Sequence, residues 1–264
     1  MDLQLKNKTA LVTGSTAGIG YAIAKSLATE GAIVYINGRD QNKVDSVVQK
    51  LVTETGNSNI KGIAADFSDK QQIDNLLKEL PEVDILINNV GIFEPKEFKN
   101  IPDEDWLKFF EVNVLSGVRL ARVYFDKMLA KNWGRIIFIS SESAIQIPAE
   151  MIHYGMTKTA QIAIARGLAE LTTGTNVTVN TVLPGPTASE GATEFVKTVA
   201  KELGKTDAEM EKEFFASMRG TSLIKRFLAP AEIANMVTYI ASPLSSATNG
   251  ATLRTDGGVI KTAF

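Results

Sequence analysis

A short apolar run, Thr9–Val12, stops at a glycine-rich turn, and this junction constrains the fold more than any other stretch of the chain. The glycines of the turn are Gly14, Gly18 and Gly20. Apolar residues at helical spacing follow, and a second apolar run occupies 32–36 after Gly31. A short apolar run bounded by glycine indicates a buried strand, and glycine is typical of a helix end. The order strand, turn, helix and strand predicts a βαβ unit.

The glycine-rich turn has the properties of a phosphate site. Glycines let the main chain approach a pyrophosphate closely, and the helix N-terminus offers free N–H groups and a positive dipole end. The spacing of Gly14, Gly18 and Gly20 differs from the usual G-x-G-x-x-G fingerprint, and any tight strand-to-helix turn can require glycine. The βαβ context favours nucleotide binding.

The residues after the second strand indicate which nucleotide binds. A carboxylate there would bind the adenosine ribose hydroxyl and repel a 2′-phosphate. The chain instead has Asn37, Gly38 and Arg39. Arg39 can pair with a 2′-phosphate, which favours NADP and leaves NAD possible; Lys43 is a weaker candidate for the same phosphate. The alternative is that Arg39 is a solvated loop charge before Asp40, a plausible helix N-cap.

Five further strands alternate with helical patterns. They occupy 60–65, 83–87, 134–139, 176–182 and 250–255. We therefore predict an α/β fold, with one domain over 1–264 and a doubly wound, parallel, seven-stranded sheet of the Rossmann type that has helices on both faces.

Polar residues follow several strands, at the edge where an open parallel sheet binds its ligand. Asp66 and Phe67 follow the third strand, where the carboxylate can cap the next turn, contact an adenine amino group, or do both. Paired asparagines at 88–89 follow the fourth strand and can also satisfy the turn backbone. Asn113 lies among apolar residues in a long helical pattern. Its buried amide needs a partner, so these residues alone favour a structural role.

Tyr154 and Lys158 are four residues apart, so a helix places them on one face. The lysine ammonium would lower the pKa of the tyrosine from about 10 toward neutrality. Such a tyrosine would be a general acid near neutral pH. The same spacing arises by chance on helix surfaces, so a solvated pair is the alternative.

Composition excludes several classes of function. The chain has no cysteine, which excludes disulfides, thiolate nucleophiles and cysteine metal sites. His153 is the only histidine, so we expect no metal site, and a Ser-His-Asp triad is disfavoured. A net charge of −2 without a basic cluster argues against nucleic acid or an anionic membrane as a partner. Because neither a signal-peptide pattern nor a transmembrane run is recognised, a cytoplasmic location is expected.

Residues 187–228 interrupt the alternation of strands and helices. Two helices are predicted there, at 189–203 and 206–218, and the second opens with a capping box of Thr206 and Glu209. We expect this segment to be a lid over the active site, or alternatively an ordinary helical layer.

In this order, the motifs resemble the short-chain dehydrogenase/reductase family over essentially the whole chain. The resemblance rests on the glycine turn at 13–20, Asn-Asn-Val-Gly at 88–91 with valine where alanine is usual, Asn113, Ser141 thirteen residues before Tyr154, Tyr154-x-x-x-Lys158, and Pro184-Gly185. Each motif is weak alone, but the ordered set is specific.

The resemblance implies an enzyme that moves a hydride between nicotinamide and a carbonyl or secondary alcohol. Tyr154 would exchange a proton with the substrate oxygen, and Ser141 would position the carbonyl. Lys158 would lower the pKa of Tyr154 and bind the nicotinamide ribose. Asn113 would hold a water that relays protons to Lys158. Ser140 is a second hydroxyl beside Ser141, but the spacing favours Ser141.

The resemblance also implies a set of cofactor-binding residues. They are Gly14, Ser15, Thr16, Gly18, Ile19, Gly20, Arg39, Asp66, Phe67, Asn89, Val90, Gly91, Tyr154, Lys158, Pro184, Gly185, Thr187 and Ser189. The family places threonine four residues after the Pro-Gly glycine to bind the carboxamide. Here that residue is Ser189, with Thr187 nearby, so either hydroxyl can serve. His153, next to Tyr154, can face the substrate or pack.

These expectations describe an NADPH-dependent ketone or 3-oxoacyl reductase that acts on a small carbonyl or alcohol. Pocket walls at 91–98, 142–153 and 187–228 suggest a partly apolar substrate and no strong anion clamp. The resemblance implies a homo-oligomer, a tetramer or a dimer. The alternative is a non-catalytic, dinucleotide-binding regulator on the same fold. Such proteins usually lack the tyrosine or the lysine.

Overall fold

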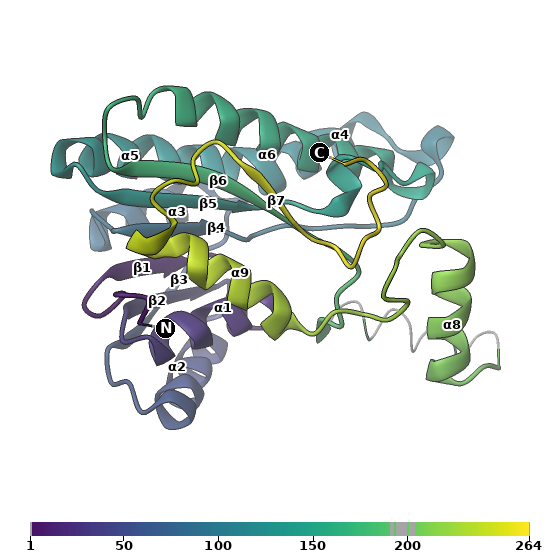
Figure 1. Cartoon of the computed structure of the whole chain (residues 1–264), viewed down its shortest axis with the longest axis horizontal. Helices are drawn as coiled ribbons and strands as arrows, with labels where there is room; N and C mark the ends of the chain where they lie inside the picture. The colour runs from purple at the N-terminus through teal and green to yellow at the C-terminus, as the bar shows by residue number, and fades with distance from the viewer. Residues whose placement is uncertain (1, 191–192, 194–199, 201–203, 264) are drawn as a thin grey trace.

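The computed structural model describes residues 2–190, 193, 200 and 204–263, and its central element is a parallel sheet. The order of the seven strands is β3-β2-β1-β4-β5-β6-β7. Their bounds are β1 (Thr9–Val12), β2 (Ile33–Gly38), β3 (Ile60–Ala64), β4 (Ile85–Asn88), β5 (Gly134–Ile139), β6 (Val177–Pro184) and β7 (Thr252–Thr255). The predicted doubly wound, seven-stranded parallel sheet is confirmed, with strand ends shifted by up to two residues (Figure 1).

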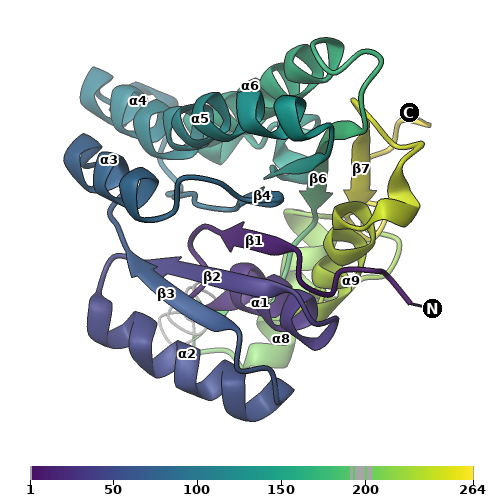
Figure 2. The ribbon, with the colours of Figure 1, turned by 90° about the vertical axis from the view of Figure 1, so that its left-hand side faces the viewer.

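Helices cover both faces of the sheet, which is why β4, β5 and β6 are buried along their whole length (Figure 2). One face carries α1 (Gly18–Thr29), α2 (Gln41–Thr55) and α9 (Pro230–Ala241), and the other carries α3 (Lys70–Glu79), α5 (Ser116–Lys131) and α6 (Ile152–Glu170). Each layer buries an apolar stripe against the strands. Within the part of the chain that the structure describes, no helix has the length and apolar character needed to cross a membrane.

The direction in which successive strands are added to the sheet reverses between β1 and β4. From β1 the chain winds outward to β3 and then returns to β4 on the other side of β1. At such a reversal the loops after the two strands separate and leave room for a ligand. Thr13 joins the two loops, because its Oγ1 accepts hydrogen bonds from the main-chain N–H groups of Asn89 (2.9 Å) and Val90 (3.1 Å).

The predicted long helix around Asn113 is not uniform. It consists of α4 (Asp103–Phe110), a π-helical turn at Glu111–Leu115, and α5. Asn113 lies at the middle of the π turn. A single π turn inside a helix is often found at a functional site, because it re-aims the side chains at that point.

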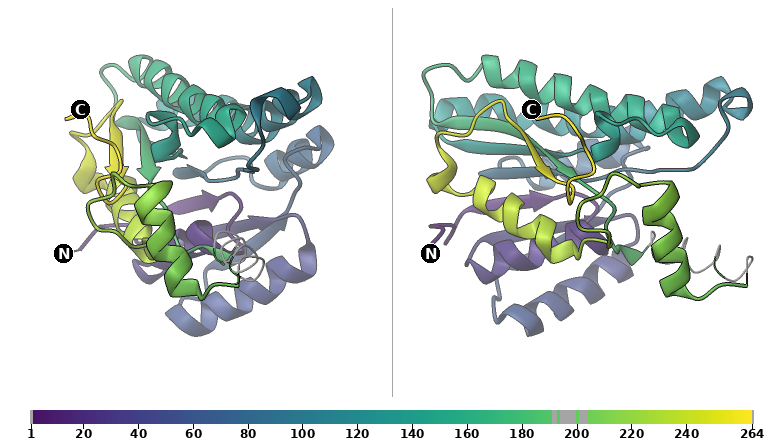
Figure 3. Two further views of the ribbon diagram at one scale, coloured as in Figure 1. Left: turned by 90° about the vertical axis from the view of Figure 1, so that its right-hand side faces the viewer. Right: turned by 45° about the vertical axis from the view of Figure 1, so that its right-hand side comes forward.

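The segment after β6 leaves the sheet at Thr187 and returns beside that residue at Leu228. Leu228 pairs with Thr187, and its carbonyl accepts from Ala188 N at 2.8 Å. In between, α8 (Asp207–Ser217) stands apart from both helical layers, beyond the carboxyl edge of the sheet (Figure 3). Its predicted capping box is confirmed, since Thr206 N donates to Glu209 Oε2 at 2.8 Å and Glu209 N donates to Thr206 Oγ1 at 3.3 Å. Most of the helix predicted at 189–203 lies outside the described residues.

Candidate active site

Three adjoining cavities lie along the carboxyl edge of the sheet. The first contains eight of the predicted cofactor residues: Gly14, Thr16, Arg39, Asp66, Phe67, Asn89, Val90 and Gly91. The second shares Asn89 and Gly91 with the first and adds Ile19, Ser141, Tyr154, Lys158, Pro184, Gly185, Thr187 and Ser189. The third shares Ser141 and Tyr154 with the second and extends toward α8. The structure therefore brings most of the predicted site residues into one elongated site.

Gly20 and Gly18 shape the first turn without lining the cavities. A Cβ on Gly20 would lie 2.4 Å from Gly14 O and 2.6 Å from Asn89 Nδ2, so only glycine fits there. Gly18 and Gly14 instead have positive φ angles of 56° and 60°, a region that favours glycine. Gly14 and Gly18 thus permit the backbone conformation of the turn, and Gly20 lets the turn pack against the loop after β4.

Ser15 points into the protein rather than into a cavity. Its Oγ donates to Val12 O at 2.7 Å and accepts from Asn37 N at 2.9 Å. Asn37 in turn accepts from Gly14 N at 3.0 Å and donates to Ile63 O at 3.1 Å. Sequence reasoning had noted Asn37 only because it is not a carboxylate. Its buried amide holds the glycine turn to β3, a role that its place at a strand end could have suggested.

The predicted nucleotide-selecting side chains lie at the outer end of the first cavity. Arg39 is exposed there and forms no hydrogen bond or ion pair with any residue that the structure describes. Lys43, one turn along α2, is exposed but does not line the cavity. Asp66 caps its own turn, since its Oδ1 accepts from Ser68 N at 2.9 Å, and it also lines the cavity. Lys108 is a further cation on this cavity that sequence reasoning missed.

Ser141 and Ser140 are clearly distinguished by their surroundings. Ser140 Oγ donates to the main-chain carbonyl of Lys158 at 2.8 Å, which anchors α6 to the end of β5. Ser141 lines both the second and the third cavities beside Tyr154. The geometry therefore agrees with the spacing in favouring Ser141 as the serine that faces a substrate.

Tyr154 and Lys158 share a face of α6, but Lys158 Nζ forms no hydrogen bond with the Tyr154 hydroxyl among the described residues. It donates to Ile139 O at 2.9 Å and to Gln161 Oε1 at 3.3 Å, and it lies 5.6 Å from the centre of the Tyr154 ring. Burial lowers the pKa of Lys158 to about 7. Burial likewise raises the pKa of Tyr154 above its usual value, and the neighbouring Ser141 hydroxyl opposes this only in part.

The expectation that Lys158 brings the pKa of Tyr154 toward neutrality is wrong for this structure. Desolvation disfavours the charged form of each group, and the partners of Lys158 are neutral acceptors. The phenol is consequently protonated at neutral pH and can donate a proton.

Asn113 is fully engaged with the protein. Its Oδ1 accepts from Ile92 N at 2.8 Å, and its Nδ2 donates to Ile92 O and to Thr157 Oγ1, both at 3.0 Å. These hydrogen bonds give the buried amide the partners that a structural role requires, and they leave the predicted water-holding role untested. Gln161 Nε2 donates to Asn113 O at 2.6 Å, so Gln161 links that carbonyl directly to Lys158. Sequence reasoning missed Gln161, although a polar residue three positions after Lys158 falls on the same helix face.

His153 packs instead of facing a substrate. It is fully buried, its ring lies 4.1 Å from that of Phe109 between ring centres, and neither nitrogen finds a hydrogen-bond partner among the described residues. Trp106 contacts it edge-on. Burial lowers its pKa.

We expect the imidazole of His153 to titrate below about 6.5, the usual value for an unfolded chain. Because the folded pKa is lower than the unfolded one, the unfolded chain binds more protons between the two values, so stability decreases as the pH is lowered through that window. Imidazole NMR shifts recorded against pH would measure this directly, since the chain has one histidine. His153→Phe removes the titration and should flatten the acid side of the stability profile. Titration at or above about 6.5 would contradict the burial argument.

The third cavity has the wall segments that the sequence predicted. Apolar side chains come from three parts of the chain: Phe93, Pro95, Met151, Phe214, Met218 and Phe227. Among them stands a buried ion pair that sequence reasoning missed, in which Arg219 Nε donates to Glu142 Oε1 at 2.8 Å. The two residues are 77 positions apart, so no local pattern could have joined them.

Known proteins resemble the chain over its whole length. A family model described as short chain dehydrogenase matches residues 8–206. An uncharacterized oxidoreductase of Bacillus subtilis, YvaG, is 52% identical over 264 residues and covers 100% of both chains. A 3-oxoacyl-[acyl-carrier-protein] reductase of Aquifex aeolicus is 30% identical and covers 98% of this chain and 100% of its own. L-sorbose reductase from Gluconobacter frateurii, solved with NADPH and L-sorbose, has a TM-score of 0.93 at 28% identity and covers 99% and 100% of the two chains.

Proposed function

Because the chain belongs to the short-chain dehydrogenase family, we propose that it is an NADPH-dependent reductase of ketones, which can also run in reverse on secondary alcohols. When bound, the nicotinamide nucleotide supplies the hydride for the carbonyl carbon. Tyr154 supplies the proton for the carbonyl oxygen, so ketone, NADPH and one proton give alcohol and NADP⁺. The observation that supports this most is the position of Ser141 and Tyr154, which line both the nucleotide-side and the α8-side cavities.

The residues of the first two cavities fit a dinucleotide. The turn with Gly14 and Gly18 leaves main-chain groups at the start of α1, where a pyrophosphate is stabilised by N–H groups and the helix dipole. Asp66 and Phe67 lie at the adenosine end, and Pro184 and Gly185 lie at the opposite end.

Four residues of the chain have separate roles around the substrate oxygen and the nucleotide. Tyr154 is protonated at neutral pH and lines the same two cavities as Ser141, so both hydroxyls can converge on one carbonyl oxygen. Lys158 is fixed by Ile139 O and Gln161, and from there its ammonium can bind a ribose hydroxyl. Asn113 stabilises the π turn beside Gly91, and we retain the water-relay role for it as part of the proposal.

Hydride chemistry tests the function directly. Purified protein with NADPH and a panel of ketones, 3-oxoacyl thioesters, quinones and sugars should consume the near-ultraviolet absorbance of NADPH. The panel includes the substrate types in the names of the Aquifex reductase and of L-sorbose reductase. Absence of turnover together with absence of nucleotide binding would refute the proposal. Nucleotide binding without any turnover would favour the non-catalytic regulator.

The choice of NADPH depends on Arg39. Arg39→Asp should lower the ratio of kcat/KM with NADPH to that with NADH roughly ten- to a hundredfold, because a charge-assisted hydrogen bond to the 2′-phosphate becomes a repulsion. The measurement is steady-state kinetics with both nucleotides at one ionic strength.

Lys43→Asp is the matched control, since it makes the same charge change on a side chain that does not line the cavity. An unchanged nucleotide preference in Arg39→Asp, with a change in Lys43→Asp, would transfer the phosphate role to Lys43.

A further inference from the structure

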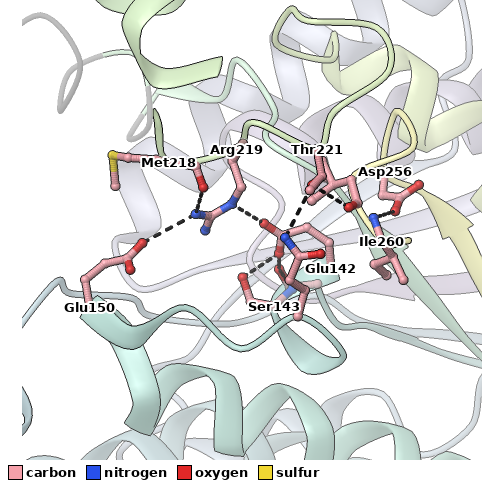
Figure 4. Close-up of polar contacts among 12 residues, drawn as sticks. Glu142, Ser143, Glu150, Met218, Arg219, Thr221, Asp256 and Ile260 are labelled. Atoms are coloured by element: carbon pink, nitrogen blue, oxygen red, sulfur yellow. Dashed lines mark hydrogen bonds and ion pairs between the residues drawn. The ribbon is translucent and has the colours of Figure 1, made fainter. Parts of the chain in front are cut away.

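Glu142 is a buried carboxylate in the wall of the α8-side cavity, directly after the serine that faces the substrate. Only 3% of its surface is exposed. Figure 4 shows its side chain between Ser143 and Arg219. Oε1 accepts from Arg219 Nε at 2.8 Å, and Oε2 accepts from Ser141 Oγ at 2.7 Å and from Ser143 Oγ. Among the described residues, the hydrogen bonds to this carboxylate all come from side chains that line the cavity.

Arg219 forms ion pairs with both Glu142 and Glu150, so its charge is already matched by carboxylates of the cavity wall. The guanidinium is buried and also reaches Glu150 Oε1 at 3.4 Å and its neighbour Met218 O at 2.9 Å. One positive charge therefore faces two carboxylates. A substrate carboxylate or phosphate at this point would meet a net negative charge, so the site suits a neutral group that donates a hydrogen bond.

Ser141 has a single proton, and in this structure it donates that proton to Glu142. A substrate carbonyl can accept from Ser141 only if the hydroxyl turns away from Oε2. The carboxylate then loses a hydrogen bond in a buried position, which is costly unless another donor replaces it. Ser143 and Arg219 already donate to Glu142, and a substrate hydroxyl beside the carbonyl oxygen is a donor that can replace Ser141.

Building on the proposed function, we propose that Glu142, held by Arg219, binds a substrate hydroxyl on the carbon next to the reacting carbonyl. The substrates are then α-hydroxyketones, or vicinal diols in the oxidative direction. The two oxygens of such a substrate stand side by side, as Ser141 Oγ and Glu142 Oε2 do at 2.7 Å. The carbonyl oxygen accepts the hydrogen bond of Ser141, and the substrate hydroxyl donates to Glu142 Oε2 in place of Ser141. The apolar side chains of Phe93, Phe214 and Phe227 contact the rest of the molecule.

The test compares acetoin with butanone, which has the same carbon skeleton without the hydroxyl, and with the isomer whose hydroxyl is one carbon further from the carbonyl. In the parent enzyme with NADPH, kcat/KM for acetoin should exceed that for either comparison ketone by about tenfold or more. Equal rates with all three would overturn the inference while leaving the reductase function intact. No NADPH oxidation with any carbonyl would instead refute the proposed function.

The Glu142→Gln variant distinguishes a substrate-binding role of Glu142 from a purely structural one. The amide oxygen would stay on Arg219, which places the amide N–H₂ at Ser141, where it cannot accept from a hydroxyl. The ratio of kcat/KM for acetoin to that for butanone should fall by roughly tenfold. A parallel loss with both ketones, at an unchanged ratio, would show that Glu142 only supports the site.

Glu150→Gln is the matched control, because it removes a carboxylate from the same guanidinium at a distance from Ser141. In Glu150→Gln the ratio of kcat/KM for acetoin to that for butanone should equal that of the parent. If Glu142→Gln does not fold, the comparison of the three ketones in the parent enzyme still decides the proposal.

Discussion

Tyr154→Phe is expected to lower kcat/KM for ketone reduction by about 10²- to 10⁴-fold, the usual contribution of a general acid. The substitution removes only the phenol oxygen. The ring keeps its edge contact with Phe93, at 6.4 Å between ring centres, so the cavity wall is preserved. Ser141 remains to polarise the carbonyl but has no protonated partner beside it. NADPH binding, measured by fluorescence, should change little, because the phenol contributes less to it than the glycine turn does.

Tyr239→Phe is the control for this change. Tyr239 is 39% exposed on α9, and the same oxygen is removed there away from the three cavities. It should keep the activity of the parent. A Tyr154→Phe enzyme that reduced ketones at the parental rate would exclude Tyr154 as the proton donor. If that variant also matched the parent in every other assay, the regulator interpretation would be preferred.

Gly20→Ala is expected to damage both the nucleotide site and the fold. The added methyl group would lie 2.4 Å from Gly14 O and 2.9 Å from Ser15 Cα, and both are main-chain atoms that cannot rotate away. The turn would have to shift relative to α1. We expect the free energy of unfolding to fall by about 3 kcal/mol, at the upper end of the usual cost of overpacking. The Kd of NADPH should rise on the order of tenfold, because the phosphate-binding N–H groups move with the turn.

Gly167→Ala provides the matched control. Gly167 lies inside α6, and a Cβ there would meet no described heavy atom within 4 Å. Alanine should stabilise that helix by roughly 0.5–1 kcal/mol and leave nucleotide binding as it is. Chemical denaturation and fluorescence titration measure both quantities. A Gly20→Ala protein as stable as Gly167→Ala, with the parental Kd, would contradict the close packing at the glycine turn.

The parts of the fold that sequence predicted are those with a local signal. β1 and β5 have the predicted bounds, because a run of only a few apolar residues between glycine or polar residues favours a buried strand over a helix. The capping box of α8 was predicted for the same reason, since Thr206 and Glu209 are three residues apart. The fourth strand was placed two residues too early, because Val83 and Asp84 are buried without belonging to β4.

The parts of the site that sequence missed depend on contacts between distant residues. Nothing near Glu142 indicates that Arg219 will lie against it, and nothing near Lys158 indicates that its ammonium will point at Ile139 O and Gln161. The expected lowering of the Tyr154 pKa by Lys158 was wrong because it depends on the surroundings of both groups in the fold. Their spacing implied an attraction between charges, but burial was not visible in the sequence.

The sequence alone determined the order of strands and helices, the glycine turn, and the residues that follow each strand. Because parallel strands end at one edge of a sheet, that order was enough to predict that Gly14, Asn89, Ser141 and Gly185 would line adjoining cavities. Only the tertiary structure decided which groups are buried, which acceptors hold Lys158, and which cation neutralises Glu142. Those outcomes depend on desolvation and on side chains meeting across the fold, and neither is encoded in local spacing.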